Sequence, residues 1–339
     1  MPDRIDPHAV PNSVVDSVPN DVPIGILNDL GIGGVTDVTP QPGGWGGTML
    51  WRVWRREHPT ALLLRIFPAG QRDVATREEI AHRLAARSGV PVPDVIASGV
   101  SGSCSVLLLT WCPGQTVADH LRNAPDRVDR IGEACGETLA RIHGISVSSD
   151  EFHGVDWISR AGPYAERLRP LLEGACAGIP QNRLLHMDYH PENILVQNDI
   201  GAVSTAVSAA VSAAVSAAVS PAVTAAVSPV VTAVIDWANV CIGPPPADLA
   251  RSRSILRILE FHPDVPADAR PMLQQFERGF MNEYSRLCGQ DPHANAFDAW
   301  AWAMQVSDLG SKIGQPGIWI TADQVDVLRH ECNRRVESL

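Results

Sequence analysis

Lysine is almost absent from this chain of 339 residues, in which Lys312 is the only example. Any role that a lysine ammonium usually fills must therefore fall to an arginine or be missing. Positive charge is short overall, since the formal net charge is −11. Binding to nucleic acid requires clustered Lys and Arg, so we expect no nucleic-acid partner. The acidic balance instead suits a cationic ligand or a solvated surface.

Paired cysteines and a secretory signal are also missing. The seven cysteines are an odd number without C-x-x-C spacing, which indicates free thiols in a reducing compartment. The first residues, MPDRIDPHAV, contain no apolar segment of the kind that directs secretion, so we predict a cytoplasmic protein. A hydrophobic fraction of 45% with 19% charged residues is typical of a globular chain, and the length suggests one large domain or two lobes.

Charge is absent between Asp199 and Asp236, where residues 202–233 form eight tetrapeptides related to AVSA. The run is long enough to cross a membrane. Ser or Thr recurs in every unit, Pro221 and Pro229 interrupt the run, and no Trp/Tyr belt or Lys/Arg flank accompanies it, so we expect no membrane association. We predict a low-complexity insertion, either a long β-ribbon or a mobile loop.

The rest of the chain divides into an arm and two lobes. Residues 1–23 show no sustained hydrophobic period, which predicts a flexible N-terminal arm. Strand and helix patterns follow over 24–110, and the segment Trp111-Cys112-Pro113-Gly114 then ends a strand abruptly. Because such an ending suits a hinge, we predict a first lobe over 24–110 and a second lobe over 111–339 that carries the insertion.

A glycine cluster lies between two expected strands, Val35–Thr39 and Met49–Trp54. It consists of Gly43, Gly44, Gly46 and Gly47, and Thr48 follows it. Glycines allow a backbone to turn tightly and to approach a ligand closely, as a loop that covers phosphate must. A plain hairpin turn explains the same residues, so both interpretations stay open.

Arg65 lies in the middle of an apolar strand, where a charge without a partner is costly. A helix pattern follows over Asp73–Arg87 and carries Glu78 and Glu79 near its start. Either glutamate can pair with Arg65 across a strand–helix interface. Alternatively, the glutamates serve only to stabilise the N-terminal end of the helix.

The most informative segment reads LLHMDYHPENILV over residues 184–196. Asp188 and Asn193 have the D-x-x-x-x-N spacing of phosphoryl-transfer loops, in which Asp accepts a hydroxyl proton and Asn holds magnesium. Asp236 ends the apolar strand pattern Val234-Ile235, from which an acid can reach into a cleft. Magnesium takes oxygen ligands, and Asn193 and Asp236 supply them.

A second interpretation of this segment is a zinc site. Alternation along a strand puts His186, Asp188 and His190 on one side, as the ligands of a metallohydrolase. That interpretation gives no role to Asn193 or Asp236.

Three motifs together resemble the phosphotransferase enzyme family, which includes aminoglycoside phosphotransferases, choline and homoserine kinases and macrolide kinases. They are H-x-D-x-H-P-x-N-I-L-V at 186–196, V-I-D-W at 234–237 and G-P-x-x-x-D-L-A at 243–250. The resemblance covers roughly residues 30–250 and implies an α+β, two-lobed, protein-kinase-like fold. A small N-lobe with an antiparallel sheet plus a helix would bind ATP or GTP against a larger, mainly helical C-lobe.

The resemblance also implies roles for individual residues. Asp188 would be the catalytic base, Asn193 and Asp236 the Mg²⁺ ligands, and His186 and Asp248 supports of the loop. The nucleotide would contact the glycine cluster with Thr48, the base-binding backbone from Thr110 to Cys112, and Arg65 paired with Glu78 or Glu79. The implied reaction transfers the γ-phosphoryl group to a hydroxyl of a small molecule, with an aminoglycoside or macrolide as the favoured class, in a monomer or homodimer.

Two departures from the family pattern leave an alternative open. Arg65 replaces the usual lysine with a wider, permanently charged group, which is compatible with a nucleotide-binding protein of little activity. The insertion over 202–233 replaces a short hairpin, and we predict that it leaves the cleft and is dispensable. Met187 in place of an arginine, and the short stretch from Asp236 to Asp248, argue against a protein kinase.

The acceptor is not defined by these motifs. Acids of the helical part, which are Asp156, Glu166 and Glu173, suit the amines of an aminoglycoside. Tryptophans of the same part, which are Trp300, Trp302 and Trp319, suit an apolar acceptor such as a macrolide or belong to the core.

Overall fold

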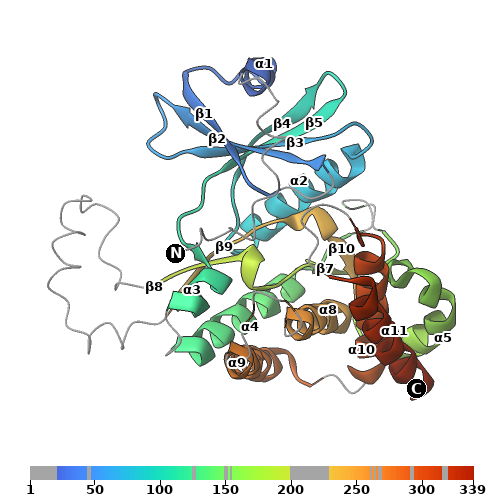
Figure 1. Ribbon diagram of the computed structural model, residues 1–339. Helices are drawn as coiled ribbons and strands as arrows, with labels where there is room; N and C mark the ends of the chain where they lie inside the picture. Colours follow the sequence, from blue (N-terminus) through green and yellow to red (C-terminus); the bar gives the residue numbers. More distant parts are fainter. Residues whose placement is uncertain are drawn as a thin grey trace, which may run out of the picture.

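The structure is a computed structural model, and it describes residues 21–43, 47–123, 127–148, 152, 155–198, 229–259, 262, 265, 269–290, 294–314 and 320–339. The described residues form a smaller lobe built on a sheet and a larger lobe built mainly of helices (Figure 1). Most of the predicted arm over 1–23 lies outside the described residues, as do Gly44 and Gly46 of the glycine cluster.

The N-lobe contains a five-stranded antiparallel sheet in the order β1-β2-β3-β5-β4. Its strands are β1 (Val35–Gln41), β2 (Met49–Arg55), β3 (Leu62–Phe67), β4 (Val95–Ser101) and β5 (Cys104–Thr110). The inner strands β3 and β5 read LLLRIF and CSVLLLT. They are almost continuously apolar because both faces of the sheet are covered.

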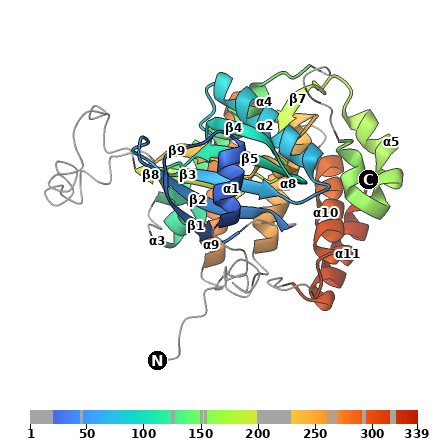
Figure 2. The same cartoon turned by 90° about the horizontal axis from the view of Figure 1, so that it is seen from above.

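One helix covers each face of this sheet. Helix α1 (Asp21–Asp29) lies over one face, as Figure 2 shows, and its Leu27 is fully buried there. Helix α2 (Arg72–Arg87) packs on the opposite face, where its Ala75 joins a cluster with Leu107 and Leu109. Alternate residues of β3 therefore point to different helices.

Strand register places Arg65 at the centre of the sheet. Its cross-strand neighbours are Leu50 on β2 and Leu107 on β5. Leu107 belongs to the cluster under α2, so the Arg65 side chain lies on the α2 face. Helix α2 is therefore one element from which an acid can reach this buried guanidinium.

The C-lobe is built mainly of helices that surround a few short strands (Figure 1). Its helices are α3 (Val117–Asn123), α4 (Val128–Gly144), η3 (Ile158–Tyr164), α5 (Ala165–Ala175), α8 (Pro245–Leu259), α9 (Arg270–Cys288), α10 (Ala294–Gly310) and α11 (Ala322–Glu337). Two large apolar clusters fill it, one centred on α4 and α9 and the other on α10.

Helices α4 and α9 approach until their backbones touch. A Cβ added to Gly132 of α4 would lie 2.5 Å from the carbonyl oxygen of Phe276 on α9. Cβ atoms at Gly136 of α4 and Gly279 of α9 would collide with the backbone of the other helix in the same way. Glycine is therefore required at these three positions by the separation of the two helices.

Short strands hold the segments with the predicted site residues at the upper side of the C-lobe in Figure 1. Strand β7 (Arg183–Leu185) pairs with β10 (Cys241–Gly243), and β8 (Ile194–Asn198) pairs with β9 (Pro229–Val234) and with β6 (Gln115–Thr116). The loop over 186–193 runs from β7 to β8, with the 3-10 turn η4 (Pro191–Asn193) at its end.

The predicted limits of the insertion are corrected by strand β9. Residues 229–233 pair with β8, and Ala233 is fully buried, so these residues belong to the sheet. The reason is that the last tetrapeptide, VVTA, runs directly into the apolar Val234-Ile235, and the two together make one strand. The remaining repeat, 202–228, lies outside the described residues.

The prediction of a two-lobed α+β fold is confirmed, with a sheet plus α2 in the N-lobe and a mainly helical C-lobe. None of the helices in the described part of the chain is long and apolar enough to cross a membrane.

Candidate active site

Strand pairing brings together two polar segments that are far apart in the sequence. Asn193 ends the 186–193 loop immediately before β8, and Asp236 follows β9. Ile235 N–H donates to the Asn193 carbonyl at 2.9 Å, so the antiparallel pairing extends to the residue before Asp236. The two predicted magnesium ligands therefore lie on neighbouring backbone segments at one end of the β8–β9 pair.

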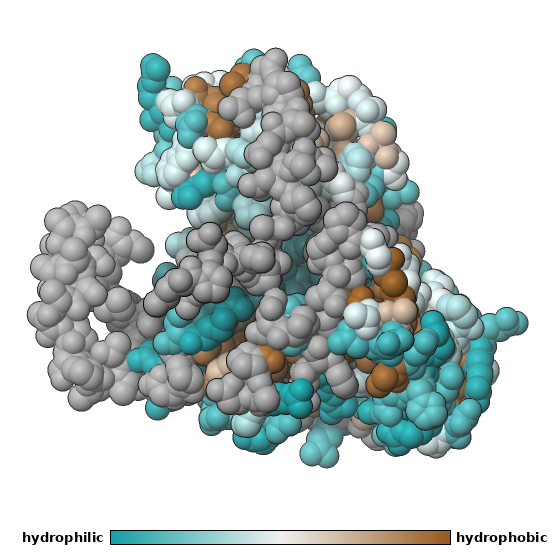
Figure 3. Space-filling view, viewed as in Figure 1, coloured by the Kyte–Doolittle hydropathy of each residue, from teal (hydrophilic) through white to brown (hydrophobic). Residues whose placement is uncertain are grey.

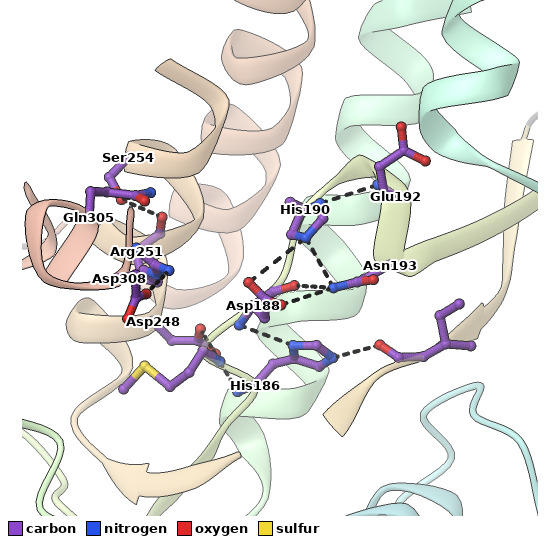
Figure 4. A network of polar contacts seen from close by, with 12 residues as sticks. His186, Asp188, His190, Glu192, Asn193, Asp248, Arg251, Ser254, Gln305 and Asp308 are labelled. Atoms are coloured by element: carbon purple, nitrogen blue, oxygen red, sulfur yellow. Dashed lines mark hydrogen bonds and ion pairs between the residues drawn. The ribbon is translucent and has the colours of Figure 1, made fainter. Parts of the chain in front are cut away.

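Asp188 and Asn193 contact each other directly (Figure 4). The Asn193 Nδ2 atom donates to the backbone carbonyl of Asp188 at 3.0 Å and to its carboxylate at 3.3 Å. His190 Nδ1 contacts the Glu192 N–H at 3.4 Å, and its Nε2 lies 3.0 Å from the Asn193 Nδ2 atom and 3.8 Å from the Asp188 carboxylate. The Asp188 side chain remains 23% exposed, so its carboxylate can meet a ligand.

His186 is buried, and both of its ring nitrogens are used within the protein. Its Nδ1 accepts from the Asp188 N–H at 3.2 Å, and its Nε2 donates to the Ile235 carbonyl at 3.1 Å. Burial lowers the pKa of His186, so the ring is neutral and carries its proton on Nε2. The zinc site considered for His186, Asp188 and His190 therefore loses one of its three ligands.

The carboxylate of Asp248 binds the backbone at the start of the 186–193 loop. Its two oxygens accept the His186 N–H at 2.6 Å and the Met187 N–H at 2.8 Å. His143 Nε2 donates to the same carboxylate at 3.1 Å, and His143 Nδ1 contacts the Tyr284 hydroxyl at 2.7 Å. Asp248 thus lies in the first turn of α8 and binds the loop.

Burial and hydrogen bonding act in opposite directions on this carboxylate. Burial alone raises the pKa of Asp248, but the hydrogen bond and charge of His143, with a contribution from His186, hold its pKa below the usual value. Asp248 is therefore an anion with donors on both oxygens.

Left-handed backbone occurs at two non-glycine residues of the described chain, and both lie in this site. They are Met187, with φ of 64°, and Asp236, with φ of 60°. Such conformations cost energy and persist only where surrounding contacts fix them. The Asp248 hydrogen bond to the Met187 N–H is one such contact.

Arg65 lies between two carboxylates from different lobes. Its Nε is 3.3 Å from Glu78 on α2, and its Nη2 donates to Asp236 at 3.1 Å. Glu79 instead pairs with Arg83 on the outer surface of α2. The choice between Glu78 and Glu79 that the sequence left open therefore falls on Glu78, which is fully buried.

The same pair fixes the ionisation of both groups. Burial alone lowers the pKa of Arg65, but the charges of Glu78 and Asp236 raise it above the usual value. Burial alone raises the pKa of Asp236, but the charge and hydrogen bond of Arg65 hold it below the usual value. Asp236 is therefore available as an anionic oxygen ligand.

The glycine cluster and the hinge flank this centre. Gly43 and Gly47 have φ of 105° and 83°, which glycine adopts without strain, and Thr48 beside them is buried. At the hinge, the Thr110 and Trp111 N–H groups donate to Asp94 and Ala61. Burial raises the pKa of the Cys112 thiol, which is therefore neutral. The Cys112 N–H has no backbone acceptor within the described residues, so it can donate to a nucleobase.

Several residues of the site were not found by sequence reasoning. His143 and Tyr284 stand behind Asp248, and His82 lies 3.7 Å from Glu78. Arg52 packs its guanidinium over Trp54 and Trp111 at the hinge, with distances to the ring centroids of 4.6 and 4.2 Å. The W-R-V-W alternation on β2 was the available signal for this last stack, whereas the others depend on contacts distant in sequence.

The residues considered for the acceptor are less available than the sequence suggested. Asp156 and Glu173 both pair with Arg169, which offsets their charge. Trp300 is fully buried and donates to the Ile158 carbonyl, and Trp302 is 95% buried, so both belong to the core. Trp319 lies outside the described residues.

Comparison with known proteins adds a family and a fold. The family model described as "Phosphotransferase enzyme family" matches residues 37–206, which is half of the chain. No curated protein sequence matches. The structure resembles a type VIII aminoglycoside-3'-phosphotransferase at 16% identity and a TM-score of 0.53, covering 83% of this chain and 98% of that one.

Two further structures give the same picture. A putative fructosamine-3-kinase from Haemophilus somnus 129PT is 12% identical with a TM-score of 0.53, covering 93% of this chain and 96% of that one. The ADP-bound aminoglycoside phosphotransferase APH(2'')-Ib is 10% identical with a TM-score of 0.51, covering 95% and 98%. At these identities the likeness shows the fold, which is the kinase-like fold predicted from the sequence. Together with the family model over residues 37–206, this means that the chain belongs to the phosphotransferase enzyme family.

Proposed function

We propose that this protein is a small-molecule kinase that uses ATP or GTP with Mg²⁺ and transfers the γ-phosphoryl group to a hydroxyl. One observation carries the proposal: Asp188, Asn193 and Asp236 converge from the loop and from β9, and Arg65 reaches Asp236 from the N-lobe. Phosphoryl transfer depends on positioning and charge stabilisation more than on covalent chemistry, and this set of groups supplies both.

Asp188 would accept the proton of the acceptor hydroxyl. Its carboxylate is partly exposed, and Asn193 and the backbone contact of His186 fix its position. A base must lie within hydrogen-bond reach of the proton that it removes, so a fixed but accessible carboxylate meets the geometric requirement.

Asn193 and Asp236 would hold the magnesium ion. The contacts of Asn193 described above use its amide nitrogen, which leaves the amide oxygen for a cation, and Asp236 is an anion with a side chain 33% exposed. Both are hard oxygen donors of the kind that magnesium prefers. When bound, magnesium offsets negative charge on the phosphate oxygens.

Arg65 would pair with the nucleotide phosphates in place of the usual lysine. Its guanidinium is held by the buried Glu78, so its position is defined from the α2 side. The planar fork of arginine can bind phosphate and a carboxylate together through different N–H groups.

An assay for transfer tests this function. The purified protein is incubated with Mg²⁺ and ATP or GTP and with aminoglycosides, macrolides, amino alcohols, sugars and nucleosides, and phosphorylated products are identified by mass spectrometry. We propose an aminoglycoside or macrolide as the acceptor class.

Asp188→Asn should lower turnover by about 10²–10⁴-fold, while Asp326→Asn, an exposed matched substitution on α11, should leave it unchanged. Full turnover by Asp188→Asn would show that Asp188 is not the base.

A nucleotide-binding protein with little activity is the second candidate. The ion pair between Arg65 and Asp236 favours it, because this pair engages a proposed magnesium ligand before any nucleotide arrives. Nucleotide binding by calorimetry without transfer to any acceptor supports this candidate. An Arg65→Lys variant that gains turnover would identify the arginine as the cause.

A further inference from the structure

A large cavity lies in the C-lobe apart from the groups proposed for catalysis. Its volume is about 1100 Å³, and it is bounded by the C-terminal ends of α4 and α9, the start of α8 and of α10, and the turn before β7. None of Asp188, Asn193 and Asp236 lines it. The apolar part of its wall includes Ala140, Ile179, Pro180, Leu249 and Met281.

The cavity wall is connected to the 186–193 loop by hydrogen bonds. His143 and Tyr284 both line the cavity. Tyr284 contacts His143, and His143 donates to Asp248, whose oxygens accept the backbone N–H groups of the loop. A molecule in the cavity would therefore touch the two side chains that support Asp248 from behind.

The charges around the cavity are unequally balanced. Three arginines and one aspartate line it: Arg183, Arg253, Arg286 and Asp298. Arg253 pairs with Glu277 and Asp298, and Arg286 pairs with Glu283. Arg183 donates to the Gly144 carbonyl and the Ser146 hydroxyl, and no carboxylate within the described residues pairs with it. One cation without an anionic partner among the described residues thus lies at the wall of a cavity that has both apolar and polar lining residues.

We propose that this cavity binds an amphipathic carboxylate, with its anionic head at Arg183 and its apolar body against Leu249 and Met281. A carboxylate supplies the anionic partner that Arg183 lacks, and the guanidinium can donate two parallel hydrogen bonds to its oxygens. The volume of the cavity is sufficient for a molecule of the size that protein pockets commonly enclose.

Occupancy of the cavity stabilises the arrangement in which Tyr284, His143 and Asp248 hold the loop. A ligand that binds better to one arrangement shifts the population toward it. Bound carboxylate therefore raises turnover by keeping the loop in place. This coupling rests on the proposed kinase function, whereas binding to the cavity does not.

Binding is tested with sodium decanoate on the full-length protein. Calorimetry should detect decanoate, whereas decyltrimethylammonium, with the same chain and the opposite charge, should not bind. Arg183→Gln should weaken decanoate binding about tenfold or more, and Arg183→Lys should retain most of it. Equal binding to wild type and Arg183→Gln, or equal binding of both probes, would overturn the assignment.

Cys288 provides an independent readout of occupancy. It lines the cavity and is the exposed one of the seven cysteines, all of which lie in described residues. Decanoate should slow the alkylation of Cys288, with the rate measured by mass spectrometry. Cys104, which lies outside the cavity, should react at an unchanged rate. Ala140→Phe, which narrows the cavity from α4, should abolish this protection in protein whose thermal unfolding remains cooperative. Protection that persists in this variant contradicts the site.

The coupling has a separate test. Decanoate should raise turnover of the wild type, and Tyr284→Phe, which removes the hydroxyl that contacts His143, should bind decanoate but lose the increase. An active enzyme that binds decanoate without any change in turnover contradicts the coupling. If the protein transfers phosphate to no acceptor, the proposed function fails, and calorimetry with Cys288 protection still decides the binding site.

Discussion

The 186–193 loop and the Arg65 cluster, which we define as Arg65, Glu78 and Asp236, both bury charge but neutralise it with different partners. In the loop, Asp248 receives two backbone N–H groups and a histidine N–H. In the cluster, the guanidinium lies between two carboxylates. Hydrogen bonds to the backbone depend on direction and fix its path, whereas an ion pair tolerates changes of geometry.

This difference implies that Asp248 is a rigid support of the loop, whereas the ion pairs of the Arg65 cluster can rearrange. The hydrogen bond from the Met187 N–H to Asp248 holds Met187 in left-handed backbone. It thereby fixes the position of the Asp188 backbone, which follows directly. The Arg65 pairs join the N-lobe to the C-lobe, and the Asp236 side of the cluster is the more exposed one. We therefore expect nucleotide binding to rearrange the Arg65 cluster and to leave the loop unchanged.

Removal of the Asp248 carboxylate should have the largest effect. Asp248→Ala leaves two loop N–H groups and His143 without their acceptor in the protein interior, and it should lower the free energy of unfolding by about 3–5 kcal/mol. Urea denaturation followed by circular dichroism measures this loss. The exposed Asp326→Ala serves as the control, and equal stability of the two variants would refute the supporting role of Asp248.

Neutralising Glu78 should have a smaller effect, because Asp236 continues to pair with Arg65. Glu78→Gln should lower the free energy of unfolding by about 2 kcal/mol. Glu79→Gln, on the next residue, removes only an exposed i,i+4 pair and should cost about 0.3–0.5 kcal/mol. The two variants are compared by urea denaturation. A larger loss for Glu79→Gln would reverse the assignment of the Arg65 partner.

Shortening the repeat tests whether the loop and the cluster depend on the chain between them. Replacing 202–228 with a turn of about four residues keeps β9 intact and should stabilise the protein by about 1–2 kcal/mol, because less closure entropy is lost. Nucleotide binding by calorimetry should be unchanged. A loss of binding would contradict the prediction that the insertion is dispensable.

Acidification should affect the loop before the cluster, and this is the smallest expected effect. The folded-state pKa of His186 lies below its ordinary value of 6.5, so its contribution to stability is complete above that pH and is lost as the pH falls below it. Asp236 and Asp248, whose pKa values lie below 3.8, contribute above that pH and lose their contributions only under stronger acid. Stability measured against pH should decline first below 6.5, and His186→Asn should remove that first decline. A first decline that persists in the variant belongs to another group.

Local patterns predicted the elements of the fold well. The helix expected over Asp73–Arg87 is α2 (Arg72–Arg87), because its apolar period is set by neighbouring residues. The 202–233 limit was wrong at its end for the opposite reason. Residues 229–233 share their composition with the repeat, and only pairing with β8 makes them a strand.

Contacts between distant segments decided the rest of the site. Glu78 and Glu79 are neighbours at the start of one helix, and the rotation of α2 against β3 selects Glu78. Motif spacing selected Asp188, Asn193 and Asp236 as candidates, because each lies in a short local motif, and the pairing of β8 with β9 brings the two motifs together. His143 could not be assigned to Asp248 in this way, since it approaches from the end of α4, a separate helix.

The three glycines between α4 and α9 affect the candidate site as well as the packing of the two helices. Helix α4 carries His143 near its end, and α9 carries Tyr284, so the distance between the helices sets the distance between these two side chains. A methyl group at Gly136 would collide with α9 and push it outward. Such a change would loosen the support of Asp248 from a position that touches neither nucleotide nor acceptor. Glycines that are distant from the loop in sequence thus help to fix the position of the loop, because they set the distance between α4 and α9.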